Sequence, residues 1–126
     1  MTSVDMTDAA DRHVFHITER GTFAAALESG FYEAESLRVE GFIHCSTGTQ
    51  VLRSAARFFG GKSGLVLLCL DAERLGALLR YEAADGEWFP HCYGPIPLAA
   101  IPAVIDFPCR PDGSFEMPQE LQLLSG

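Results

Sequence analysis

The chain has 126 residues, a length typical of one domain, and 48% of them are hydrophobic, which argues against a disordered protein. Its net charge of −8 argues against a nucleic-acid partner, because binding a phosphate backbone requires a basic face. Residues 1–11 lack the apolar stretch of a signal peptide, and the longest apolar run, Leu65–Leu70, is too short to span a bilayer, so we expect a cytoplasmic protein with no membrane partner.

The first half of the chain predicts strands on either side of a helix. His13–Ile17 alternates in polarity and is rich in strand formers, which indicates a strand. Thr18 is expected to cap a helix that Gly30 ends. Residues 37–40 are predicted to be extended or a turn, and Phe42–Cys45 to be a second strand.

The second half begins with the strongest helical pattern, because residues 49–59 repeat apolar side chains at three- and four-residue spacing. Leu65–Leu70 predicts a fully buried strand, and Asp71 is expected to cap a short helical turn. Further along, we predict a strand at 80–82, a polar turn at 83–87, a proline-constrained loop at 89–97, one helical turn at 98–101 and a strand at 103–107.

Strands outnumber helices and do not alternate with them regularly, which favours an α+β domain with a mostly antiparallel sheet. We expect a flexible N-terminus at 1–12, a single domain at 13–118 and a C-terminal tail at 119–126. The four cysteines form no C-x-x-C pair and lie in apolar surroundings, so reduced thiols are expected. The oligomeric state has no signature in the sequence.

Two segments, GFIHCST (41–47) and FPHCYG (89–94), each place an aromatic residue two positions before a His-Cys pair. Neighbouring side chains of a strand point to opposite faces, so His44 and Cys45 are not expected to bind one metal ion. We therefore predict no metal site and no tightly bound cofactor. A three-histidine metal site, made by His16, His44 and His91, stays open as an alternative.

Each of these histidines is followed two residues later by a hydroxyl side chain, which lies on the same face of an extended chain. These hydroxyls belong to Thr18, Ser46 and Tyr93. Such pairs indicate a polar surface that binds a ligand, although each histidine could instead be a satisfied, partly buried side chain.

Two further features fit a binding surface. Ser46 and Thr47 lie just before the long predicted helix, where free backbone N–H groups attract anions, or where the same residues simply cap the helix. Glu82 and Arg80 share one face of a predicted strand. They could form an exposed ion pair, or Glu82 could act as a base or hold a ribose hydroxyl near the histidines.

The stretches HVFHITERGTF, EGFIHCST and FPHCYGPIPLAAI resemble, in this order, the domain-of-unknown-function family 952. The family's fold resembles that of the ADP-ribosyltransferases and the RNA 2′-phosphotransferases. That resemblance implies two small, mostly antiparallel packed sheets with a cleft between them and two or three short helices. It also implies that His16 holds an NAD-type ligand, that Ser46 with His44 beside it forms the second part of the site, and that Glu82 or His91 forms the third.

The expected function is therefore the binding of NAD or ADP-ribose in a histidine-lined cleft, with ADP-ribosyl or phosphoryl transfer as its chemistry. The candidate catalytic residues are His16, His44, Glu82 and His91, and the candidate ligand-binding residues are Thr18, Ser46, Thr47, Arg80 and Tyr93. A non-catalytic small-molecule sensor that uses the same pocket is the main alternative, and a histidine-triad metal hydrolase is a further one.

Overall fold

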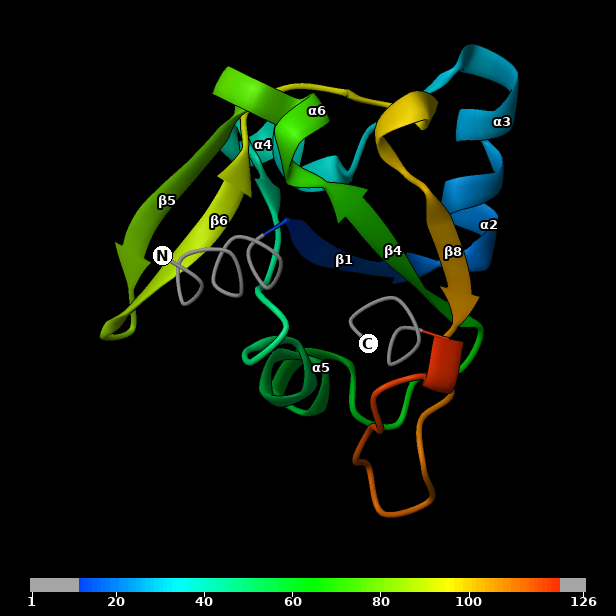
Figure 1. Ribbon diagram of the computed structural model, residues 1–126. Helices are drawn as coiled ribbons and strands as arrows, with labels where there is room; N and C mark the ends of the chain where they lie inside the picture. The colour runs from blue at the N-terminus through cyan, green and yellow to red at the C-terminus, as the bar shows by residue number, and fades with distance from the viewer. Residues whose placement is uncertain (1–11, 121–126) are drawn as a thin grey trace.

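A computed structural model describes residues 12–120 of the chain (Figure 1). Its central sheet contains three antiparallel strands in the order β1 (His13–Glu19), β4 (Leu65–Asp71) and β8 (Ala103–Asp106). The middle strand, β4, is buried along residues 65–70, as its continuous apolar run predicts.

The central sheet separates two hydrophobic cores. Alternate residues of β4 enter each of them: Val66, Leu68 and Leu70 lie in the first core, and Leu65, Leu67 and Cys69 lie in the second. Helix α5 (Val51–Phe59) covers the second core through two buried residues on its apolar face, Val51 and Ala55. Its helical pattern predicted this arrangement.

A second three-stranded sheet has the order β3 (Ile43–His44), β6 (Glu87–Cys92) and β5 (Leu79–Ala84), and it lies beside the central sheet with α5 below both (Figure 1). The two sheets are joined where Phe15 and Ser46 exchange two backbone hydrogen bonds of 2.8 Å each. Ile43 and Cys92 turn towards the first core, so the opposite face of this sheet carries the polar residues.

The other described elements are short. A two-stranded ribbon, absent from the predicted elements, contains β2 (Phe31–Tyr32) and β7 (Ile96–Pro97). The helical segments are α2 (Arg20–Ala24), α3 (Ala26–Ser29), α4 (Glu35–Glu40), α6 (Ala72–Leu75), η1 (Gly76–Leu78) and η2 (Leu98–Ala100). The fold is thus a mixed α+β domain of small antiparallel sheets, with more helical segments than the two or three expected.

Several local predictions are confirmed. Asp71 caps α6 by accepting hydrogen bonds from the N–H groups of Glu73 and Arg74. Gly30 ends α3 in the left-handed region, with φ of 88°. The predicted polar turn is a two-residue hairpin turn at Asp85-Gly86, where both φ angles are positive, as the right-handed twist of the flanking strands favours.

Three local predictions are wrong. Thr18 does not cap a helix, because β1 continues to Glu19 and the helix starts one residue later. Residues 37–40 belong to α4, which was missed because a six-residue helix shows less than two turns of periodicity. The predicted loop at 89–97 contains the later part of strand β6 and the two residues of β7. Pro90 is tolerated within β6, where its carbonyl accepts the N–H of Cys45.

The predicted N-terminal segment and C-terminal tail lie, except for residues 12, 119 and 120, outside the described residues. Within the described part of the chain, no helix has the length and apolar character needed to cross a membrane.

Candidate functional site

The polar face of the second sheet brings two of the histidines together. The strand register pairs His44 with His91, and His91 with Arg80, across β3, β6 and β5. Directly paired residues of antiparallel strands project on the same face, so these three side chains form a row across the sheet. The imidazole rings of His44 and His91 lie edge to face, with their centroids 5.6 Å apart.

Each of these two imidazoles is held by a carboxylate. The Nε2 atom of His44 lies 3.1 and 3.2 Å from the two carboxylate oxygens of Glu40, four residues earlier on α4. The Nδ1 atom of His91 lies 2.7 Å from Glu82 Oε1 on the neighbouring strand. A carboxylate oxygen only accepts, so His44 Nε2 and His91 Nδ1 carry the donated protons.

Aromatic rings pack around the two histidines. Phe42 stacks on His91, with ring centroids 4.1 Å apart and planes inclined by 22°, and it also contacts His44 and Tyr93 at 4.8 and 5.4 Å. The guanidinium of Arg80 lies 4.8 Å above the ring of Tyr93, as in a cation–π contact. We call the set Glu40, Phe42, His44, Arg80, Glu82, His91 and Tyr93 the surface cluster.

Exposure and charge vary across the surface cluster. The side chain of His91 is 9% exposed, whereas those of Glu82 and His44 are 39% and 55% exposed. The pKa of Glu82 is lowered, first by the hydrogen bond that the Tyr93 hydroxyl donates over 2.5 Å and then by the bond from His91. The same bond to Glu82 raises the pKa of Tyr93.

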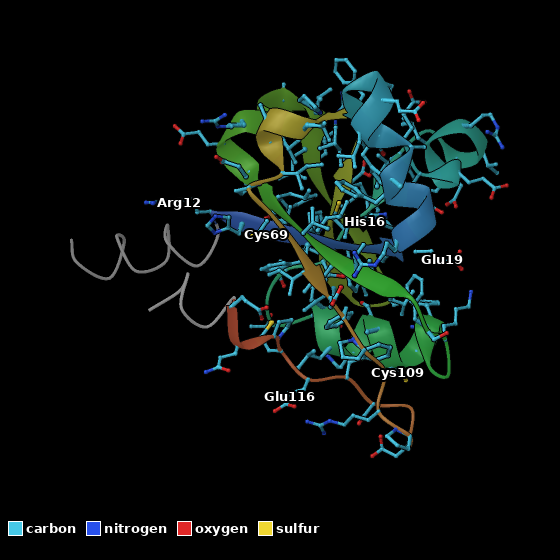
Figure 2. The ribbon with its side chains drawn as sticks, turned by 90° about the vertical axis from the view of Figure 1, so that its right-hand side faces the viewer. Arg12, His16, Glu19, Cys69, Cys109 and Glu116 are labelled. Carbon is cyan, nitrogen blue, oxygen red and sulfur yellow. The ribbon has the colours of Figure 1, made fainter. Side chains whose placement is uncertain are left out.

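A second polar group lies beneath this surface. His16 is buried in the interior of the molecule (Figure 2), on the face of β1 that looks into the first core, opposite Leu68. Its Nδ1 atom donates to the backbone carbonyl of His44 over 2.6 Å. Its Nε2 atom must then accept the hydroxyl proton of Tyr32 over 2.8 Å, and Thr18 in turn hydrogen bonds to Tyr32. We call the set Thr18, Tyr32 and His16 the buried chain.

Burial sets the ionisation of the buried chain. Loss of solvent around His16 lowers the pKa of its imidazole to about 4, so the ring is neutral at physiological pH. Burial likewise raises the pKa of Tyr32 to about 12. Both ring nitrogens of His16 have hydrogen-bond partners within the fold, the carbonyl of His44 and the hydroxyl of Tyr32.

The predicted histidine–hydroxyl pairs have different partners in the structure. Thr18 reaches His16 only through Tyr32, and Tyr93 reaches His91 only through Glu82. Ser46 is buried, and its hydroxyl contacts Ser54 over 3.3 Å rather than His44.

The segment before α5 is held by its own side chains. The backbone N–H of Thr47 donates to the side-chain carbonyl of Gln50 over 3.0 Å. Gln50 also donates to the carbonyl of Trp88 over 2.9 Å, so it ties the start of α5 to the β5–β6 hairpin. The residue before α5 is Gln50, which makes no side-chain cap hydrogen bond, and the hydroxyls of Ser46 and Thr47 contact Ser54 and Thr49, so the predicted cap by Ser46 and Thr47 is not seen.

Four residues that contact the candidate site residues were not predicted from the sequence. Phe42 had a local signal, because a residue two positions before His44 shares its face in a strand. Glu40 was missed because it lies on the unpredicted helix α4. Gln50 was expected within a helix over 49–59, whereas α5 begins after it, at Val51. Tyr32 comes from a two-residue strand with no sequence signal of its own.

Two hollows on the surface lie apart from the surface cluster. One of these is lined by residues of α2 and α4 and of the segment between them, including Thr22 and Arg38. Another is lined by residues near the end of the described chain, including Cys109 and Glu120. Neither of these two hollows is lined by a histidine.

The cysteines and acidic residues do not add a metal site within residues 12–120, where no group of three or more His, Cys, Asp or Glu side chains is arranged to hold an ion. The four cysteines are free thiols, and Cys45 turns into the first core while the neighbouring His44 turns outwards. Burial raises the pKa of Cys45 and also raises that of Cys69, to about 11, so these thiols stay protonated.

Comparison with known proteins identifies the family. The family described as "Protein of unknown function (DUF952)" matches residues 17–104, and the chain belongs to it. The crystal structure of protein CC0527 from Caulobacter crescentus is similar, with a TM-score of 0.80 and 34% sequence identity over 87% of this chain and 98% of that chain. The solution NMR structure of CC0527 is similar with a TM-score of 0.75, at 34% identity over 89% of this chain and 98% of that chain. No curated protein matches the sequence.

Proposed function

We propose that this member of the DUF952 family is a cytoplasmic domain that binds NAD or a related nucleotide, such as ADP-ribose, on the surface cluster and acts on it as an ADP-ribosyl or phosphoryl transferase. The proposal includes an ADP-ribosyltransferase-like arrangement of the two sheets. The observation that carries it is the row of His44, His91 and Arg80 across three strands, in which both imidazoles are held by carboxylates. Ionisable groups whose pKa values are shifted by specific partners, as those of Glu82 and Tyr93 are, mark candidate functional sites.

Each group of the surface cluster has a role in this proposal. Arg80, held over the ring of Tyr93, supplies a positive charge for a phosphate in an otherwise acidic protein. His44, which is half exposed, donates a hydrogen bond to the same anion, and Glu82 accepts one from a ribose hydroxyl or stabilises positive charge at the anomeric carbon. The partly buried ring of Phe42 offers an apolar edge to a base.

His16 takes a different role from the one that the family resemblance implies. Its two ring nitrogens are bonded to Tyr32 and to the carbonyl of His44, so it has no donor or acceptor to spare for a ribose or a pyrophosphate. We assign it to holding β3 in place, and thereby the side chain of His44.

A non-catalytic sensor that uses the same face is the second candidate. It is favoured by the exposure of the site, because the side chains of His44 and Glu82 are 55% and 39% exposed. Enzymes that transfer groups usually exclude water from the reacting atoms, whereas a reversible sensor has no such need.

Calorimetric titration of the full chain with NAD and with ADP-ribose tests the proposal, with His44→Ala as the variant and Arg57→Ala as its control. Arg57 is an exposed cation that pairs with Asp85 at the hairpin turn, outside the surface cluster. Loss of a hydrogen bond to a charged group costs about 1.5–3 kcal/mol, so His44→Ala should weaken binding by roughly tenfold or more. Arg57→Ala should leave affinity nearly unchanged, because its charge is screened. Equal losses in both variants, or no heat with either ligand at millimolar concentration, would contradict the proposal.

A further inference from the structure

The two imidazoles of the surface cluster each have one ring nitrogen to spare. Glu40 occupies Nε2 of His44, and Glu82 occupies Nδ1 of His91. Among residues 12–120, His44 Nδ1 and His91 Nε2 have no hydrogen-bond partner. The rings are only 5.6 Å apart, so they are close enough to contact different oxygens of one phosphoanhydride.

The surroundings of the two rings differ in the way that an acid and a base require. His91 is nearly buried, it is stacked on Phe42, and its Nδ1–H is fixed by Glu82, so its Nε2 presents a lone pair. A carboxylate in this position also stabilises the imidazolium that forms when Nε2 takes a proton. His44 is half exposed and its Nε2 is held by Glu40, so its Nδ1 is the nitrogen left for a ligand.

We propose that His91 is the general base and His44 the general acid in hydrolysis of the pyrophosphate of a bound nucleotide, a step that rests on the proposed function. His91 Nε2 takes a proton from a water molecule as the water oxygen bonds to one phosphorus. The bond from that phosphorus to the bridging oxygen breaks, and protonated His44 gives its Nδ1 proton to that oxygen. The products are two phosphate monoesters, and solvent returns the two histidines to their starting states.

Arg80 supplies the positive charge for this hydrolysis. It is paired in register with His91, and its guanidinium lies over Tyr93, so it is held at the row where the phosphoryl oxygens would lie. A positive charge there stabilises negative charge that builds up on those oxygens as the water attacks. The same row therefore supplies a base, an acid and a counter-charge.

The test is hydrolysis of ADP-ribose by the full chain, followed by phosphorus NMR in the presence of EDTA. We expect AMP and ribose 5-phosphate as the products. When the reaction runs in ¹⁸O water, the phosphate group of one of them should contain an ¹⁸O atom. His91→Gln and His44→Gln should each lower the rate by at least about a hundredfold, because each removes one proton transfer. His13→Gln is the matched control: His13 begins β1, opposite Asp71, outside the surface cluster, and its substitution should leave the rate unchanged.

His91 is nearly buried, so its variant is paired with Glu82→Gln, which keeps the shape and an acceptor at a partly exposed position. Removing this charge should lower the rate at least about tenfold while melting temperature stays near that of the parent chain. Hydrolysis that EDTA abolishes, or that both histidine variants retain, would overturn the inference.

The failure of this inference can be told apart from that of the proposed function. If calorimetry shows ADP-ribose binding while its pyrophosphate stays intact, the inference is wrong and the binding proposal stands. If NAD releases nicotinamide while its pyrophosphate is intact, the site transfers ADP-ribosyl groups, and the inference is again wrong. If neither ligand binds and neither is cleaved, both proposals fall.

Discussion

The buried chain and the surface cluster meet at one residue, His44, yet they use histidine in opposite ways. The carbonyl of His44 accepts a bond from His16 below the sheet, and its side chain faces His91 above. His16 has both ring nitrogens bonded inside the protein, whereas His44 and His91 each have one nitrogen held by a carboxylate. The comparison shows that partners and solvent, more than residue type, decide which histidine is available to a ligand.

Desolvation is the physical cause of this difference. Burial favours the neutral ring of His16, which can then donate at one nitrogen and accept at the other. In the surface cluster, carboxylates hold one nitrogen of each ring, and His44 is half exposed to solvent, whereas His91 is nearly buried. A stable fold therefore depends on the first region, and we expect ligand chemistry to depend on the second.

The largest expected effect comes from removing His16. His16→Ala leaves the Tyr32 hydroxyl and the His44 carbonyl without their partner in the interior and opens a cavity, so it should lower the free energy of unfolding by about 3 kcal/mol or more. His44→Ala removes a half-exposed side chain and should cost less than about 1 kcal/mol. Urea unfolding of both variants measures the difference. Equal losses would mean that the two regions do not differ as the structure indicates.

The next largest expected effect is a loss of stability at low pH, which should come from the buried chain. The pKa of His16 is about 4 in the folded state against 6.5 as its ordinary value, so the unfolded chain binds more protons between these pH values. Stability should therefore fall as pH drops from 6.5 towards 4, by about 3 kcal/mol, since 6.5 − 4 is 2.5 pKa units of roughly 1.36 kcal/mol each.

Urea midpoints across this pH range test the assignment. His16→Gln should remove much of the slope between pH 4 and 6.5, because the titrating group is gone, although its starting stability is lower. His13→Gln, at the start of the same strand, should keep the slope of the parent chain. A slope unchanged in His16→Gln would assign the acid sensitivity to other groups.

The sequence predicted the two regions unequally, for a physical reason. Part of the surface cluster could be anticipated, because strand parity places Phe42 with His44 and Arg80 with Glu82, but Glu40 could not, because it lies on the unpredicted helix α4. The buried chain could not, since Tyr32 reaches His16 only after β2 pairs with β7, and two-residue strands leave no periodic signal. The apolar run of β4 and the amphipathic pattern of α5 were predicted because each extends over several residues, whereas β2 is too short to show a pattern.

Prolines explain the largest error in the fold. Pro90 lies inside β6, and its lack of an N–H indicated a loop when the sequence was considered alone. The strand tolerates Pro90 because the neighbouring segment at Cys45 donates a hydrogen bond to the carbonyl of Pro90 and needs no N–H from it. Which groups of a strand are needed depends on the register, and the register is fixed only by the complete sheet.

Tyr32 and Tyr93 offer a finer comparison of the two regions. The hydroxyl of Tyr32 bonds to His16 in the buried chain, and that of Tyr93 bonds to Glu82 in the surface cluster. Tyr32→Phe removes the donor to His16 Nε2 in the interior and should lower the free energy of unfolding by about 1–2 kcal/mol. It should leave ligand affinity at the surface cluster nearly unchanged. Urea unfolding together with calorimetry checks both expectations, and a stability equal to that of the parent chain would count against the buried hydrogen bond.

Tyr93→Phe should have the smallest effect on stability and a clear effect on one ionisation. The Tyr93 hydroxyl is the first cause of the lowered pKa of Glu82, so its removal should raise the pKa of Glu82, while the bond from His91 still holds that pKa below its ordinary range. A phenylalanine ring keeps the surface on which Arg80 stacks, so the variant separates the hydroxyl from the ring. A carboxylate with a lowered pKa contributes stability above its unfolded pKa and loses it as pH falls, so Tyr93→Phe should weaken this contribution at neutral pH, and the difference from the parent chain should vanish in acid. Carbon-detected NMR titration of the glutamate carboxyl groups, with Tyr32→Phe as the matched control, would show the rise for Glu82 in one variant alone. If Glu82 titrates in the same way in both variants, the Tyr93 hydroxyl does not bond to Glu82 in solution. Glu82 would then hold His91 without a second hydrogen bond from Tyr93.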